Sequence, residues 1–116
     1  MVWARLQADL NCKLRRGAWY RLIKVEGLAA VVDVNRQPVP VVRAFLQLSK
    51  SPPRRWTVVP RPRNVPVSVQ VGAQYAVCPS CRDRVPLRGR PSRMFCVRCS
   101  VDFEVAWEEH YLTHKM

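Results

Sequence analysis

The first part of the chain has its apolar residues at helical spacing. Within residues 1–16 they recur every three or four positions, at Trp3, Leu6, Leu10 and Leu14. This spacing places apolar side chains on one face of an amphipathic helix. We therefore expect residues 1–16 to form an N-terminal segment that contains a short helix.

Downstream of this segment the pattern changes to that of β-strands. Three runs rich in aromatic and β-branched residues cover 18–25, 28–34 and 39–48, and turn signals at Glu26-Gly27 and 35–38 separate them. Strands joined by tight turns in this way form an antiparallel meander. The meander is the predicted centre of a sheet.

A stretch rich in proline and arginine, residues 50–66, follows the meander. A central strand cannot hold that many prolines, so we expect only a short edge strand at 56–59. Over 67–71 valines alternate with polar residues, which is the period of a half-buried strand. Five short strands predict a small β-barrel over 17–72, and the texture of residues 15–71 resembles SH3-like barrels.

Two pairs of cysteines carry the strongest chemical signal in the sequence. Cys78 and Cys81 form one CxxC pair, Cys96 and Cys99 form a second, and 14 residues separate the pairs. A tight CxxC turn directs two thiolates at one ion, and two such turns complete a tetrahedral sulfur site that suits zinc. Thiolates are soft ligands, so zinc or iron fits them and magnesium does not.

The residues around the cysteines show a strand pattern. Residues 85–87 and 94–95 are expected to form a β-hairpin with 88–90 at its tip, and the alternating run 101–107 is expected to pack on it as a third strand. This order of knuckle, hairpin, knuckle and strand resembles the zinc-ribbon family over residues 75–107. The resemblance implies a structural zinc ion and a role in transcription or translation machinery.

Other uses of the cysteines are open at this stage. An iron site of rubredoxin type needs the same four sulfurs, whereas a redox CxxC needs a βαβ context that is absent. A finger made from Cys96, Cys99, His110 and His114 would leave the first CxxC pair without a role. Without that finger, both histidines belong to a polar helical tail. Cys12 has no partner, and we expect it to be a small residue without function.

The charge balance adds a candidate partner. The chain has 20 basic and 8 acidic residues in 116, a net charge of +12, and 16 of its basic residues are arginines. Folded proteins with this excess usually bind a polyanion, and nucleic acid is the first candidate. The acidic residues are concentrated at 101–116, where four accompany a single lysine. The candidate nucleic-acid-binding residues are Arg82, Arg88, Arg90, Arg93, Arg54, Arg55, Arg61 and Arg63.

These observations predict a mainly β protein. We expect an SH3-like β-barrel at 17–72, a zinc ribbon at 73–107 and a polar tail at 108–116, with short helices at the two ends. The predicted metal ligands are Cys78, Cys81, Cys96 and Cys99, and the expected cofactor is a structural Zn²⁺.

The predicted function is a zinc-stabilised nucleic-acid-binding module, which contacts mainly phosphates of RNA or DNA. The alternative is a protein–protein adaptor or small subunit of a larger complex, in which the zinc is purely structural. No catalytic constellation is present, so we expect neither an enzyme nor a small-molecule substrate. The sequence lacks a signal peptide and a long apolar run, so we expect a cytoplasmic, intracellular protein without a membrane partner.

Overall fold

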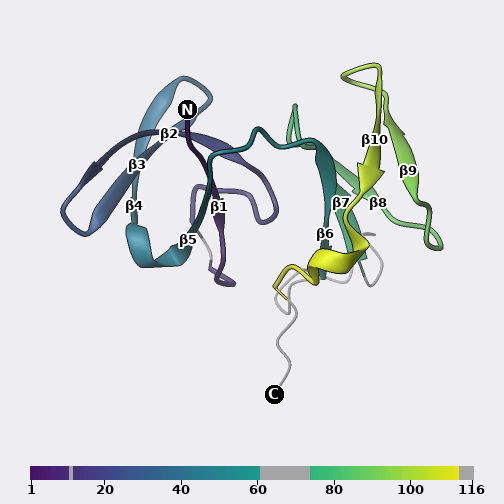
Figure 1. Ribbon diagram of the computed structural model, residues 1–116, viewed down its shortest axis with the longest axis horizontal. Coiled ribbons are helices and arrows are strands. Elements are labelled where there is room, and N and C mark those ends of the chain that lie inside the picture. Colours follow the sequence, from purple (N-terminus) through teal and green to yellow (C-terminus); the bar gives the residue numbers. More distant parts are fainter. Residues whose placement is uncertain (11, 61–73, 113–116) are drawn as a thin grey trace. The chain divides into compact units, whose positions relative to one another are not determined.

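The computed structural model describes residues 1–10, 12–60 and 74–112. Its described residues are mainly β, as the sequence predicts, with ten strands and two single-turn 3-10 helices. The chain divides into two compact units, Met1–Pro53 and Arg54–Met116 (Figure 1). Each unit has its own five-stranded sheet.

The first unit is a curled half-barrel of antiparallel strands. Its strands lie in the order β4-β3-β2-β1-β5, and the 3-10 turn η1 separates β4 from β5 (Figure 1). The elements are β1 (Trp3–Leu6), β2 (Tyr20–Glu26), β3 (Ala29–Val34), β4 (Gln37–Val42), η1 (Arg43–Phe45) and β5 (Leu46–Ser49).

Tight turns produce the meander β2–β3–β4, as predicted. Gly27 begins the turn between β2 and β3 with φ of 60°, a conformation in which glycine carries no steric cost. Asn35 and Arg36 join β3 to β4 and both have positive φ, as a type I′ hairpin turn requires. The backbone N–H of Arg36 donates to the Asp33 side chain at 2.8 Å and holds this turn.

In the described residues 1–10 and 12–16 the predicted helix does not form, because Trp3–Leu6 forms strand β1 instead. This strand pairs with β2 on one side and with β5 on the other. Ala4 and Leu6 are fully buried, and the buried Arg5 donates to the Gln47 side chain at 2.8 Å and lies 4.4 Å from the Trp19 ring. Pairing with two neighbours overrides the local helical spacing.

The second unit is a mixed sheet in the order β8-β7-β6-β10-β9. Strand β6 pairs antiparallel with β7 and parallel with β10, while β8 and β9 form the two edges. The elements are β6 (Arg55–Pro60), β7 (Gln74–Val77), β8 (Arg84–Pro86), β9 (Arg93–Cys96), β10 (Val101–Val105) and the 3-10 turn η2 (Trp107–Glu109).

The structure corrects the predicted place of the strand at 56–59. We expected an edge strand of the barrel, but β6 is the central strand of the second unit, so the boundary between the units follows Pro53 rather than residue 72. The prolines explain the difference, because Pro53 precedes the strand and Pro60 ends it. Between them Trp56–Val59 are all buried, as in a strand covered on both faces. The strand predicted at 67–71 lies outside the described residues.

The predicted hairpin between the two cysteine pairs is also wrong. Strand β8 pairs with β7, and β9 pairs with β10, so β8 and β9 lie at opposite edges of the sheet. Residues 88–90 therefore belong to a connection between the two edges and not to a hairpin tip. Up to residue 112, the described part of the expected helical tail contains the single turn η2, after which His110 adopts a left-handed conformation, and residues 113–116 lie outside the described residues.

One tryptophan organises the core of the second unit. Trp56 is fully buried, its Nε1–H donates to the Met94 carbonyl at 3.0 Å, and its ring meets the Phe103 ring edge-on at 6.4 Å. Its cluster contains two of the cysteines, Cys78 and Cys96. The buried core of this unit therefore extends to the hairpin ends that carry the cysteines.

We expect Trp56→Ala to lower the free energy of unfolding of the second unit by about 3–5 kcal/mol, because it removes a large buried ring. Trp56→Phe keeps an aromatic ring but removes the indole N–H that donates to the Met94 carbonyl, for a loss of about 0.5–1.5 kcal/mol. Denaturant titration followed by the NMR signals of β7 measures both. A loss below about 1 kcal/mol in Trp56→Ala would contradict the central position of this side chain.

Candidate metal centre

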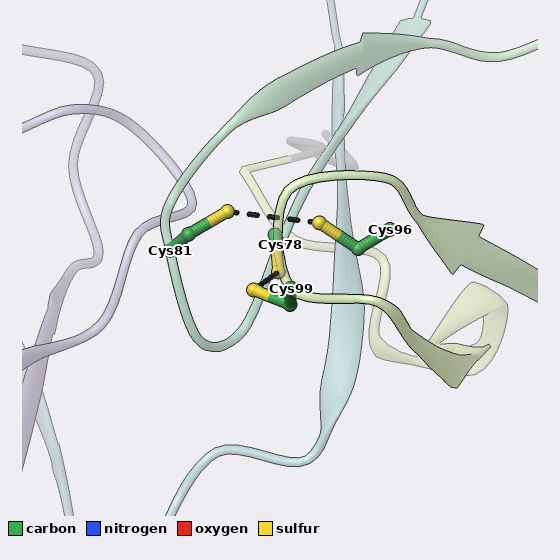
Figure 2. A group of neighbouring side chains, drawn as sticks. All are labelled: Cys78, Cys81, Cys96 and Cys99. Carbon is green, nitrogen blue, oxygen red and sulfur yellow. Dashed lines mark hydrogen bonds between the residues drawn. The ribbon is translucent and has the colours of Figure 1, made fainter.

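The two CxxC pairs lie at the ends of two hairpins. Cys78 and Cys81 lie in the connection between β7 and β8, whereas Cys96 is the last residue of β9 and Cys99 lies in the connection from β9 to β10 (Figure 2). The central strand β6 separates β7 from β10 in the sheet. Each hairpin therefore brings one pair of thiols to the same region of the second unit.

The two knuckles have the same local geometry. Cys78 accepts a hydrogen bond at its carbonyl from the N–H of Arg82 at 3.2 Å, and Cys96 accepts one from Ser100 at 2.8 Å. Arg82 and Ser100 both have a left-handed backbone, with φ of 65° and 56°. The Ser80 N–H also donates to the Cys78 sulfur at 3.4 Å. This turn lets two cysteines three residues apart face one point.

The sulfur atoms converge on one point. Cys78 Sγ lies 3.7 Å from Cys99 Sγ, Cys81 Sγ lies 3.7 Å from Cys96 Sγ, and all four lie within 4.8 Å of one another (Figure 2). A tetrahedron with metal–sulfur bonds of about 2.3 Å has edges of about 3.8 Å. The four thiols therefore fit a single tetrahedral metal ion.

The same distances exclude two other uses of these cysteines. A disulfide needs sulfurs about 2.05 Å apart, so these contacts are not disulfides. Because all four cysteines gather in one cluster, the first CxxC pair is not stranded, and the finger that would pair Cys96 and Cys99 with His110 and His114 loses its support. His114 lies outside the described residues, and Cys12 is exposed in the first unit.

Burial affects the thiols unequally. It raises the pKa of Cys78 to about 12 and also raises the pKa of Cys81. Burial acts in the same direction on Cys96, but the Cys99 backbone N–H and the neighbouring thiols outweigh it, so the pKa of Cys96 falls below its usual value. Four thiolates cannot share this space without a cation, and metal binding must therefore release protons.

The predicted arginines fall into different environments. Arg55 forms an ion pair with Glu108, Arg93 forms one with Asp102 at 2.6 Å, and the Arg90 guanidinium lies 4.6 Å from the centre of the Trp107 ring. Arg82 is half-buried after the first knuckle, and Arg54 and Arg88 are exposed. Arg61 and Arg63 lie outside the described residues.

Two exposed arginines were not in the predicted binding set. Arg84 lies on edge strand β8, and Arg98 lies in the second knuckle. The sequence places both within the basic segment that contains the cysteines, so local charge density was the signal that could have found them. Phe95 is a further candidate that the sequence did not single out. It lies on edge strand β9, and 57% of its surface is exposed.

Comparisons with known proteins give no relative. No protein-family model, no curated protein and no solved structure matches the chain. Among the described residues, no helix is both long enough and apolar enough to cross a membrane. The function is therefore argued from the chain's own residues.

We expect the purified protein to hold one tightly bound metal ion per chain, and Cys78→Ser to lose it, because a serine hydroxyl does not replace a soft thiolate. Elemental analysis after dialysis measures the metal content. Cys12→Ser is the matched control, since Cys12 is outside the cluster. Equal metal loss in both variants would contradict the four-cysteine site.

Metal affinity should rise with pH. Cys78 and Cys81 are protonated in the metal-free protein at neutral pH, so the metal must displace more than one proton. Between pH 6 and 8, competition with a chromophoric chelator should therefore show an affinity gain of more than about tenfold per pH unit. A flat pH profile would mean that the thiols are not the ligands.

Proposed function

We propose that this chain is a nucleic-acid-binding module whose second unit is stabilised by a structural zinc ion. The observation that carries the proposal is the set of exposed arginines around the four-cysteine cluster. Residues 54–116 contain eleven basic and five acidic residues. We also propose service within transcription or translation machinery in the cytoplasm, a reducing compartment in which free thiols persist.

Zinc is the proposed metal because closed sites of four cysteines are typical structural zinc sites. With four sulfurs bound, the ion has no open position for water or substrate, so its role is structural rather than catalytic. A rubredoxin-type iron would occupy the same geometry but would give the protein a visible colour, and elemental analysis separates the two metals. Binding would contribute directly to the folding free energy of the second unit.

Phosphate contacts would come from arginines that have no acidic partner. Among the described residues, Arg54, Arg84, Arg88 and Arg98 are exposed and make no ion pair. A guanidinium presents paired donors that match the oxygens of a phosphate. The described part of the chain has no α-helix that could enter a major groove, so the proposal is for phosphate contacts without base reading.

A protein–protein adaptor is the second candidate. Exposed apolar residues favour it, since Phe95, Val97 and Val101 all lie at or beside the second knuckle and are 57%, 83% and 44% exposed. Salt separates the two candidates. Phosphate binding weakens steeply as salt rises, whereas docking through an apolar surface does not.

We expect Arg84→Ala with Arg88→Ala to weaken binding to single-stranded RNA or duplex DNA by about tenfold, and to reduce the salt slope by about two, because two phosphate contacts are lost. Fluorescence anisotropy of the zinc-loaded protein at several salt concentrations measures both quantities.

The matched control is Arg36→Ala with Arg43→Ala. This variant removes the same charge from two exposed arginines of the first unit. An equal loss of affinity in the control would mean that the effect comes from net charge alone. Unchanged affinity in Arg84→Ala with Arg88→Ala would remove this part of the second unit from the binding surface.

A further inference from the structure

The edge strand β9 leaves backbone hydrogen-bonding groups without a partner strand. It forms one border of the second sheet, next to β10. The Val105 N–H donates to the Ser92 carbonyl at 2.9 Å, so these two residues form a hydrogen-bonded pair. Bonded and non-bonded pairs alternate along antiparallel strands. The non-bonded pairs are therefore Arg93 with Glu104 and Phe95 with Asp102.

This register decides which groups face outward. The N–H and C=O groups of Arg93 and Phe95 point away from β10, toward the open border of the sheet. Within the described residues, no strand pairs with them there. Their side chains also share one face of the sheet, because they are two residues apart. The border therefore presents two N–H donors, two carbonyl acceptors and one aromatic ring, beside a guanidinium that is paired with Asp102.

Two of the other three edge strands contain proline. Strand β4, at one edge of the first sheet, contains Pro38 and Pro40, and β8, opposite β9 in the second sheet, contains Pro86. Proline on an edge strand removes a donor and discourages pairing with another chain. Strands β9 and β5 contain no proline. Of these two, only β9 exposes an aromatic side chain, Phe95.

We propose that β9 is a docking edge for an extended acidic segment of a partner protein, which adds to the second sheet as a sixth strand. A segment with an apolar residue opposite Phe95 would cover the exposed ring, and an acidic residue opposite Arg93 would share the guanidinium that already pairs with Asp102. Asp102 and Glu104 belong to β10, one strand spacing of about 4.8 Å further away. This docking edge is independent of the phosphate contacts proposed for Arg84 and Arg88.

Charge argues for this occupant over a second copy of the chain. Two copies would each bring a net charge of +12 to the contact, and the resulting repulsion opposes pairing. The second unit as a whole contains eleven basic and five acidic residues. An acidic segment would be attracted to this unit from a distance, whereas a basic one would be repelled.

The test uses the zinc-loaded full chain and a synthetic peptide that alternates Glu and Val. We expect the peptide to slow hydrogen exchange at the amides of Arg93 and Phe95 by at least about tenfold, because each gains a backbone acceptor. The amides of β5 are the internal control and should not change. A peptide that alternates Lys and Val should bind at least about tenfold more weakly.

Two changes separate strand addition from simple charge attraction. N-methylation of the peptide at every second residue blocks its backbone donors, and we expect it to abolish protection. Phe95→Pro should weaken binding by at least about tenfold, because it removes an outward N–H and the ring, whereas Phe95→Ala removes only the ring and should weaken binding less. Because residue 95 lies beside Cys96, the metal content of Phe95→Pro reports whether this variant keeps its fold. The N-methylated peptide tests the proposal in the unaltered protein.

Several results would overturn the proposal. Equal binding of the N-methylated peptide would mean that charge alone holds the segment. Protection of the β9 amides that grows with protein concentration and needs no peptide would assign the edge to a second copy. Protection by single-stranded RNA, with displacement of the peptide, would assign it to nucleic acid.

Discussion

The convergence of four thiols on one point is the constraint on which the second unit depends. Two of the four cysteines, Cys78 and Cys96, belong to the buried core cluster around Trp56. A unit of about 60 residues has limited stability by itself, and a metal ion commonly supplies the difference. The sulfurs tie together segments 21 residues apart in the chain, as the contact of Cys78 with Cys99 shows. The four-cysteine cluster is therefore continuous with the core.

The central strand β6 provides the complementary constraint. It lies between β7 and β10, so backbone hydrogen bonds hold the two cysteine hairpins on either side of it. Trp56 of this strand reaches Met94 and Phe103 on the second hairpin. The hairpins are thus joined twice, by a strand along their length and by the thiols at their ends. This arrangement needs neither a helix nor a disulfide.

The arginines of the second unit divide into structural and exposed groups. Arg55, Arg90 and Arg93 are engaged with Glu108, Trp107 and Asp102. These contacts attach the turn η2 to β6 and to the segment of Arg90, and they join the edge strand β9 to β10. Arg84, Arg88 and Arg98 remain directed to solvent and carry the charge that a polyanion would meet.

The sequence by itself determined the local features of this protein. The turns at Gly27 and Asn35-Arg36 and the CxxC spacing act over a few residues, so the meander and the four-cysteine cluster were predictable. Tertiary structure decided which strands pair, because pairing depends on partners distant in the chain. It made Trp3–Leu6 a strand between β2 and β5, and it moved β6 from the barrel to the centre of the second sheet. The local spacing of apolar residues does not identify these partners, since the same apolar residues can be buried in a helix or in a strand.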